Sequence, residues 1–472
     1  MASSDSHAAV RVTELCKITP PDSPTDSSLP LTFFDIFWLK FHPVERIFFY
    51  QLTSDSDSDS DSDSFSSDIL PRLKQSLSLT LLHFIPFAGN LIWPSHSDKP
   101  FLLYSPGDGV SLTVAESDAD FHTLAGDSIR EIPDSHNYVP ELNVTETEAA
   151  TMSFQITLFP KKGYCIGISS HHGIFDGKSI IMFIKAWAHI CKNGSSSLPP
   201  ELTPVIDRAV IQDHQGLESL YLNSWMSLAS LPDMDSNPRS LKLFNMPRST
   251  SDTNYVRGTF KLSGEDIKKI RQKTFSQLDK EATNQANSKY FSTFVLSYAY
   301  VSITITKAKA LEPNKHMILG FTADVRARQD PPISTNYFGN CVSINFTQHK
   351  VGIFIKEDGL AFVAEELTKL VKGLEKKGGL DGAKEKFEES MKMDPATTEG
   401  IGVAGSPRFE VYGIDFGFGK PIKVEITSID RNTSISMAET RDGNGGVEIG
   451  VVLKKDEMEI FYSLFLYGLK DL

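Results

Sequence analysis

The sequence lacks any uninterrupted apolar run of about 18 residues, which argues against a membrane-spanning helix. Its first residues, Met1–His7, contain neither a basic stretch nor an apolar core, so we expect no secretory signal peptide. Cysteine is also scarce. The four cysteines are scattered and form no CxxC pair, which argues against a disulfide scaffold or a structural zinc site. These absences favour a cytoplasmic protein without a bound metal.

Positive charge is in deficit, because 47 Lys and Arg stand against 60 Asp and Glu, a formal net charge of −13. An acidic surface repels polyphosphate, so we expect no nucleic-acid partner. Five of the aspartates lie in a strict Ser-Asp alternation at residues 54–64. This tract has too little apolar surface to offset the entropy of ordering, so we expect a disordered loop. A phosphorylated tract or a calcium-binding strip is the alternative.

The length of 472 residues exceeds the usual size of one compact core and predicts two domains. Residues 194–238 are rich in Ser, Pro and Asp and show weak periodicity. We therefore place a crossover linker there, between an N-terminal domain of residues 1–193 and a C-terminal domain of residues 239–472.

Apolar periodicities of both strands and helices occur along the chain. Strands are predicted at residues 46–52, 152–158, 164–169, 254–262, 409–414, 422–429 and 447–453. Helices are predicted at residues 69–82, 180–190, 264–274, 292–305 and 360–374. The alternation of the two types predicts an α/β protein with layered, mixed sheets.

A histidine lies at one predicted strand-to-helix connection, in the segment His171-His172-Gly173-Ile174-Phe175-Asp176-Gly177. Histidine can accept a proton near neutral pH, and a loop between rigid elements is a common place for chemistry. Taken alone, the spacing of His172 and Asp176 also fits a surface histidine or a structural histidine whose hydrogen bonds are satisfied. Metal binding is disfavoured, because Gly173 opposes a helix and no third ligand is near in the sequence.

A second segment, Asp415-Phe416-Gly417-Phe418-Gly419, alternates glycines with aromatic residues. This pattern indicates a tight turn in which the backbone needs unusual φ angles while the rings pack. An Asp-Phe-Gly triplet also occurs in the magnesium loop of kinases. That interpretation is excluded, because no glycine-rich loop and no HRD segment precede it.

The two segments together resemble the paired signatures of the BAHD acyltransferases, HxxxD and DFGWG. Phe418 departs from the second signature, which usually has Trp there, and we expect its aromatic contact with the core to be kept. Further similarity covers nearly the whole chain, at residues 29–35, 87–91, 292–295, 324–328 and 447–450. Residues 336–341 (Asn-Tyr-Phe-Gly-Asn-Cys) resemble a motif of the branch that acylates anthocyanin and flavonoid glycosides.

The resemblance implies a two-domain fold similar to chloramphenicol acetyltransferase, with a solvent channel between the domains, and a monomer. It implies transfer of a malonyl group from malonyl-CoA, without a bound cofactor, to a sugar hydroxyl of a flavonoid, anthocyanin or other phenolic glycoside. One alternative is hydroxycinnamoyl transfer, from coumaroyl-CoA or caffeoyl-CoA, to the same acceptors. Another is a non-catalytic protein that binds acyl-CoA or a small molecule.

By similarity, His172 is the general base that removes the proton of the acceptor hydroxyl. Asp176 is expected to point away from the channel, to pair with Arg326 and so to fix the loop of His172. The resemblance also implies an essential role for Asp415, which we interpret as mainly structural. Gly417 and Gly419 are expected to serve the turn.

Five further residues are candidates for binding the donor. Lys178 follows Asp176 closely, and its cation could hold the free carboxylate of a malonyl group. Ser292 and Thr293 open a predicted helix and could donate to CoA. Lys261 and Ser263 are similar to family positions that contact CoA. For all five, a surface charge or a helix cap is the alternative.

Overall fold

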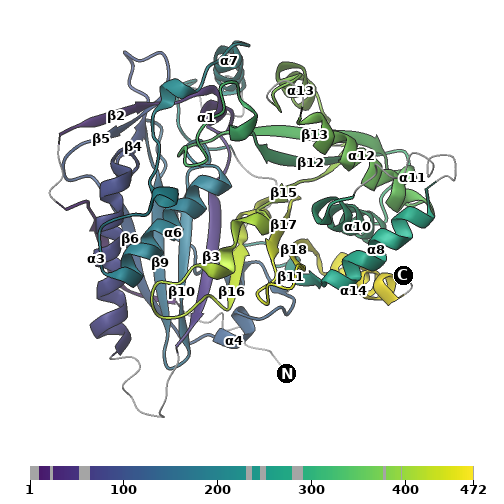
Figure 1. Cartoon of the computed structure of the whole chain (residues 1–472), viewed down its shortest axis with the longest axis horizontal. Coiled ribbons are helices and arrows are strands. Elements are labelled where there is room, and N and C mark those ends of the chain that lie inside the picture. Colours follow the sequence, from purple (N-terminus) through teal and green to yellow (C-terminus); the bar gives the residue numbers. More distant parts are fainter. Residues whose placement is uncertain are drawn as a thin grey trace.

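The computed structural model describes residues 10–21, 25–52, 64–229, 237–244, 251–278, 291–375, 379–394 and 396–470. The chain forms two lobes, each built on β-sheets with helices packed against them (Figure 1). The Ser-Asp tract lies outside the described residues, except for its last serine.

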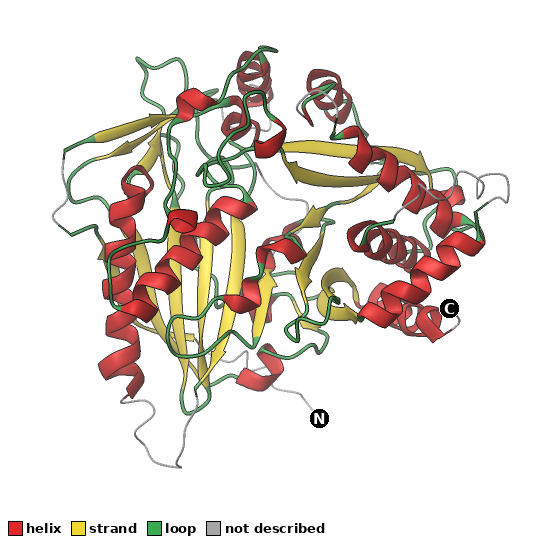
Figure 2. Ribbon diagram, in the orientation of Figure 1, coloured by secondary structure: helices red, strands yellow, loops and turns green. Residues whose placement is uncertain are grey.

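The N-terminal lobe is built on a six-stranded sheet. In spatial order its strands are β1 (Val10–Ile18), β6 (Val110–Ser117), β9 (Met152–Phe159), β10 (Gly163–Ser170), β3 (Val44–Gln51) and β16 (Lys423–Ile426). Strands β9 and β10 form the predicted hairpin, and every residue of both is buried. Helices α3 (Leu70–Leu81) and α6 (Gly177–Asn193) lie together on one face of this sheet (Figure 2).

Helix α6 is the element that carries the predicted histidine segment into the fold. Its apolar stripe is buried, and Trp187 donates a hydrogen bond from Nε1 to the carbonyl of Leu73 on α3 at 3.1 Å. The side chain of Asp176 caps the start of the helix. Gly194 ends it in the left-handed conformation, at φ 63°, which glycine adopts without a steric penalty.

The C-terminal lobe contains a second and a third sheet. The second runs β15 (Val403–Ala404), β17 (Ile435–Glu439), β18 (Val447–Lys454), β11 (Tyr255–Leu262) and β7 (Arg130–Glu131). The third runs β13 (Val342–Lys350), β12 (His316–Asp324) and β14 (Thr398–Ile401). The helices of this lobe are α8 (Gly264–Ser276), α10 (Thr293–Ala308), α11 (Val351–Phe354), α12 (Gly359–Gly373), α13 (Ala383–Ser390) and α14 (Lys455–Lys470).

A small sheet and several short helices complete the N-terminal lobe. The sheet runs β2 (Ser27–Pro30), β5 (Phe101–Tyr104), β4 (Asn90–Ile92) and β8 (Glu148–Ala150). The helices are α1 (Phe33–Phe37), α4 (Phe121–Leu124), α5 (Pro133–His136) and α7 (Leu217–Ala229). Helix α7 lies inside the stretch predicted as a linker and packs on α1.

Two short strands cross the predicted domain division. Strand β16 comes from the C-terminal half and pairs with β3 at the edge of the N-terminal sheet. Strand β7 comes from the N-terminal half and pairs with β11. The two lobes are therefore interlocked by backbone hydrogen bonds, and the division at residues 194–238 stays a prediction.

The strand predicted at residues 409–414 is wrong. Two short 3-10 turns, Pro407–Phe409 and Val411–Gly413, occupy this stretch instead. They meet at Glu410, whose φ of 52° interrupts any extended chain. The apolar residues that suggested a strand are buried by the turns, since Val411 and Ile414 are each 2% exposed. The strand predicted at residues 422–429 is shorter, because a 3-10 turn begins at Thr427.

All four cysteines are free, as the sequence predicts, and three of them are buried. Within the described ranges, no helix combines the length and the apolar character needed to cross a membrane.

Candidate active site

His172 lies in the loop between β10 and α6, where its imidazole stacks on an indole. The ring centroids of His172 and Trp38 are 4.0 Å apart and the planes differ by 4°. Phe41 approaches the same imidazole edge-on, at 6.3 Å and 65°. These two aromatic residues follow α1, and together they fix the orientation of the imidazole plane. Sequence reasoning did not single out Trp38, although it lies three residues beyond a segment of family resemblance.

The imidazole of His172 is held in its neutral form. Nδ1 is buried without a hydrogen-bond partner, so Nε2 is the nitrogen that can meet a substrate. Loss of hydration lowers the pKa of His172 to about 3, against a smaller raising effect of its own backbone carbonyl. The neighbouring His171 is also buried, and desolvation lowers its pKa to about 4. At neutral pH the ring of His172 is therefore an unprotonated base.

Asp176 anchors the end of the loop through both carboxylate oxygens. Oδ1 accepts a hydrogen bond from the backbone N–H of Ser179 at 2.8 Å. Oδ2 accepts one from the N–H of Cys341 at 3.1 Å and lies 2.8 Å from a guanidinium nitrogen of Arg326. The ion pair predicted between Asp176 and Arg326 is present, and its side chains are only 2% and 1% exposed.

Arg326 connects the histidine loop to the C-terminal half of the chain. Its guanidinium donates to the carbonyl of Gly339 at 2.8 Å and to the carbonyl of Tyr337 at 3.2 Å. Burial acts to lower the pKa of Arg326, but the carboxylates of Asp176 and Asp324 outweigh it and raise this pKa. The arginine is therefore a permanent cation at the base of the loop.

The backbone of His172 has its own support. Asn340 donates from Nδ2 to the carbonyl of His172 at 3.0 Å and to Oδ1 of Asp35 at 3.1 Å. Asp35 is fully buried and also accepts from the backbone N–H of Asn340 at 3.2 Å. Both residues lie in segments of family resemblance, but their contact with the loop of His172 was missed. No local pattern could reveal it, because they are 305 positions apart.

Lys178 projects from the first turn of α6 toward Asp324. Its ammonium lies 2.9 Å from Oδ2 of Asp324, and the two side chains are 36% and 40% exposed. The same aspartate pairs with Arg326 at 3.0 Å. The cation therefore already has a carboxylate partner, and its contact with a malonyl group stays a prediction.

Asp415 forms a turn at the opposite end of α6. Its Oδ1 accepts from the N–H groups of Gly417 and Gly419 at 2.8 and 3.1 Å. Both glycines have positive φ, 98° and 105°, as predicted for a tight turn. Oδ2 lies 2.7 Å from the ammonium of Lys192, in the last turn of α6.

The length of α6 separates Asp415 from His172. The helix has 17 residues, which corresponds to about 25 Å at the usual rise per residue. A direct part in proton transfer at His172 is therefore outside the reach of Asp415, and the structural interpretation of this residue is favoured.

Both aromatic residues of this turn contact the core of the N-terminal lobe, as predicted for Phe418. Phe416 is 1% exposed and meets Trp187 edge-on at 4.8 Å. Phe418, the position that departs from the family signature, is half-buried. Its ring lies under the guanidinium of Arg72, with 4.5 Å between the guanidinium carbon and the ring centroid.

Three of the four residues suggested for CoA lie at the start of two helices of the C-terminal lobe, and the fourth lies at the end of a strand. Ser263 caps α8 in a capping box with Asp266, and Ser292 caps α10, whose first residue is Thr293. Lys261, at the end of β11, is 49% exposed and pairs with Asp127 at 2.6 Å. Their contact with CoA stays a prediction, since capping accounts for both serines.

Comparison with known proteins agrees with this architecture. A model described as the transferase family matches residues 8–465. A malonyl-CoA:anthocyanidin 5-O-glucoside-6''-O-malonyltransferase of Arabidopsis thaliana is 41% identical, over 98% of this chain and 99% of its own length. Phenolic glucoside malonyltransferase 1 of the same plant is 40% identical over the whole of both chains. An agmatine coumaroyltransferase, also from Arabidopsis thaliana, is 40% identical over 97% of this chain and 98% of its own.

Among solved structures, vinorine synthase superposes with a TM-score of 0.69, at 20% identity and over 96% of both chains. At an identity of 20%, this similarity shows the fold and does not show the function. It confirms the predicted α/β fold of the chloramphenicol acetyltransferase type.

Proposed function

The chain belongs to the BAHD acyltransferases, and we propose that it moves the malonyl group of malonyl-CoA to a sugar hydroxyl of a phenolic glucoside. The observation that carries the reaction type is the neutral imidazole of His172, held in a fixed plane by Trp38 and Phe41. The choice of donor and acceptor is supported by the names of the malonyltransferases that match the full length of the chain.

In the proposed mechanism, Nε2 of His172 removes the proton of the acceptor hydroxyl as its oxygen attacks the thioester carbonyl. The tetrahedral intermediate then breaks its carbon–sulfur bond, and the proton passes from the imidazolium to the CoA thiolate. The products are the malonyl ester and free CoA. A positioned base of this kind contributes roughly 10²- to 10⁴-fold to the rate. Orientation of the two substrates and stabilisation of the oxyanion supply the rest.

Residues around the loop act on His172 rather than on the substrates. Asp176 and Arg326 fix the end of the loop, and Asn340 fixes the carbonyl of His172. We propose that they are positioning residues that keep the imidazole within reach of both substrates. Asp415 holds the far end of α6 in the same structural capacity.

A second candidate is transfer of a hydroxycinnamoyl group to the same acceptors. The similarity to an agmatine coumaroyltransferase supports the donor of this candidate, because its 40% identity equals that of phenolic glucoside malonyltransferase 1. The acyl group therefore has to be decided by assay. For either donor we propose a monomer that acts in the cytoplasm, in line with its four free cysteines.

The test is a donor and acceptor panel. The protein is incubated with malonyl-CoA, acetyl-CoA or coumaroyl-CoA and a set of phenolic and flavonoid glucosides, and the products are identified by mass. We expect malonyl esters on the sugar, with no product from a His172→Ala variant. Coumaroyl esters as the main product would replace the proposal by its alternative. The absence of ester with every donor would reject both.

A further inference from the structure

Arg46, on β3, is exceptional among the buried arginines. Of the described residues, five arginines are buried: Arg46, Arg130, Arg208, Arg257 and Arg326. The other four each have a carboxylate oxygen within 4.0 Å. Arg46 is 4% exposed, forms no ion pair, and its Nε is buried without a hydrogen-bond partner. An unpaired buried charge destabilises the folded protein, and a bound anion would compensate for this charge.

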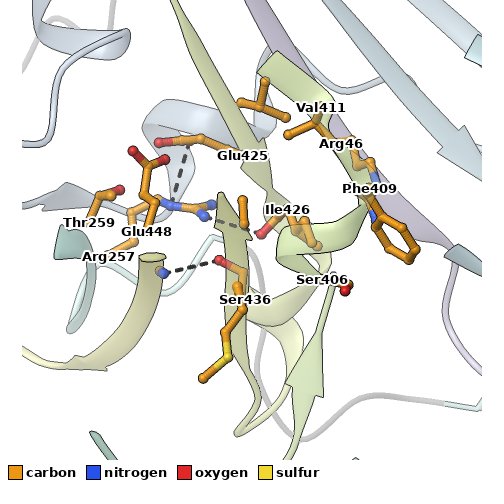
Figure 3. Close-up of a pocket in the computed structure, with 14 residues that line it drawn as sticks. Arg46, Arg257, Thr259, Ser406, Phe409, Val411, Glu425, Ile426, Ser436 and Glu448 are labelled. Atoms are coloured by element: carbon orange, nitrogen blue, oxygen red, sulfur yellow. Dashed lines mark hydrogen bonds and ion pairs between the residues drawn. The ribbon is translucent and has the colours of Figure 1, made fainter. Parts of the chain in front are cut away.

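The guanidinium of Arg46 borders a narrow cavity between the two lobes (Figure 3). The cavity lies where the edge strand β16 and its neighbour β3 of the N-terminal sheet meet β11, β17 and β18. Its wall combines the apolar side chains of Phe409, Val411, Val424, Ile426, Met437 and Ala438 with Arg257, Glu425 and Glu448, whose charges are already paired within the protein. An apolar wall strengthens the attraction between a cation and an anion that enters.

The guanidinium of Arg46 lies close to the start of α6, the helix that follows the loop of His172. A Cβ placed on Gly177, the first residue of α6, would lie 3.0 Å from the ring of Phe409 and 3.8 Å from a terminal nitrogen of Arg46. The guanidinium therefore reaches the start of α6, five residues beyond the catalytic base.

The charged groups nearby leave this cation without a close partner. Lys178 and Lys185 of α6 are paired with Asp324 and Glu410, at 2.9 and 3.6 Å. Burial is the main influence on Arg46 and lowers its pKa to about 10, against the opposing effect of the carboxylate of Glu439. Burial also raises the pKa of Glu439, which weakens that carboxylate as a counter-charge. Arg46 remains charged at neutral pH.

The geometry points to Arg46 as the residue that binds the free carboxylate of the malonyl donor, an inference that rests on the proposed function. In a malonyl thioester this carboxylate is two carbon–carbon bonds from the carbonyl that His172 must serve. A carboxylate accepts paired hydrogen bonds from a guanidinium, and an uncharged acyl group leaves that cation unpaired. Arg46 is thus the determinant of donor specificity, in preference to the exposed and already paired Lys178.

The test compares kcat/KM for malonyl-CoA and acetyl-CoA in the wild type, Arg46→Gln and Lys185→Gln. We expect Arg46→Gln to lower the malonyl-to-acetyl ratio roughly 10- to 100-fold, the usual effect of losing a charge-assisted hydrogen bond. Lys185→Gln removes a cation of helix α6 that is already paired with Glu410, so this variant is expected to keep the malonyl-to-acetyl ratio. An unchanged ratio in soluble Arg46→Gln overturns the inference.

A second measurement covers the case in which Arg46→Gln does not fold. The wild type is assayed with the methyl ester of malonyl-CoA, which keeps the malonyl carbon chain but has a methyl ester in place of the free carboxylate. Arg46→Lys is assayed with both charged and uncharged donors. We expect the ester to lose a similar factor and Arg46→Lys to keep part of the ratio. An ester that reacts as fast as malonyl-CoA overturns the inference. Wild-type protein without malonyl transfer would instead reject the proposed function itself.

Discussion

Helix α6 has at each end an aspartate that holds a turn, and the two aspartates differ in burial. At the start, Asp176 is 2% exposed and pairs with an arginine that is 1% exposed. At the end, Asp415 is 19% exposed and pairs with a lysine that is 53% exposed. A buried pair that loses one member leaves a charge without water, whereas an exposed pair is replaced by solvent. The two aspartates therefore stabilise the protein to very different degrees.

The two ends also differ in chemistry. The start of α6 follows directly on His172, whose ring is neutral and stacked on Trp38. The end of α6 holds a glycine turn and a core phenylalanine, about 25 Å away along the helix. Changes at the start should therefore affect turnover, and changes at the end should affect stability first.

The largest effect is expected from His172→Ala. Loss of the base should lower kcat roughly 10²- to 10⁴-fold while the thermal midpoint stays close to that of the wild type. Turnover with malonyl-CoA and thermal unfolding are measured side by side. His96→Ala removes an exposed histidine and serves as the matched control, with activity kept. Retained activity in His172→Ala would show that the start of α6 does not carry the catalytic base.

The next effect is on stability, at the buried aspartate. Asp176→Asn leaves Arg326 with only the half-exposed Asp324 as a carboxylate partner, so we expect a loss of about 3 kcal/mol in the free energy of unfolding. Denaturant unfolding of Asp176→Asn, Arg326→Gln and the double variant gives the coupling energy. Strictly additive single effects would show that this ion pair does not hold the loop.

Acid should act on the start of α6 first. The pKa values of His171 and His172 are lowered to about 4 and 3, below the ordinary value of 6.5. At any pH between the lowered pKa and 6.5, the unfolded chain therefore binds more protons than the folded protein. The stabilising contribution of the two neutral rings is complete above pH 6.5 and falls as the pH drops toward 4, by several kcal/mol at about 1.4 kcal/mol per pKa unit. Asp415, whose pKa is lowered from 3.8, keeps its stabilising contribution above that pH and loses it only as the pH falls further.

The measurement is the free energy of unfolding of the wild type and of His172→Gln at pH 7 and pH 4.5. The glutamine variant cannot be protonated, so its loss of stability between the two pH values should be smaller. Equal losses in both proteins would mean that the ring of His172 titrates normally in the folded state.

A smaller effect is expected from Asp415→Asn. The amide keeps an acceptor oxygen for the glycine N–H groups but loses the pair with Lys192, so we expect a loss of about 1 kcal/mol and a kcat within about threefold of the wild type. Lys192→Ala removes the other partner and should give a similar loss. A large fall in kcat at an unchanged thermal midpoint would place Asp415 in the catalytic step.

The smallest effect is expected from Phe418→Trp, which restores the residue usual in the family. The ring is half-buried under Arg72, and an indole is the best aromatic partner for a guanidinium. We expect a gain of at most about 0.5 kcal/mol and no change in turnover. Thermal unfolding at low salt measures it, and a marked loss of stability would show that the turn is packed too tightly for an indole.

Much of the fold was predictable where local periodicity is strong. The hairpin β9–β10, the start of α6 and helix α12 follow from alternation, a capping aspartate and an apolar stripe. Residues 409–414 misled the prediction, because their apolar side chains are buried through two turns around the positive φ of Glu410. The apolar residues of a segment predict that it is buried, but they do not predict the backbone conformation in which it is buried.

The sequence by itself determined the elements, the histidine segment and the glycine turn, because each depends on residues close together in the chain. It also determined the family, through two signatures that are specific as a pair. Only the tertiary structure decided which groups meet: Trp38 with His172, Asn340 with Asp35, and Arg46 with the start of α6. Such contacts join distant segments, and their burial sets the pKa of the base and the cost of an unpaired charge. Distance and dehydration arise only when the chain is folded.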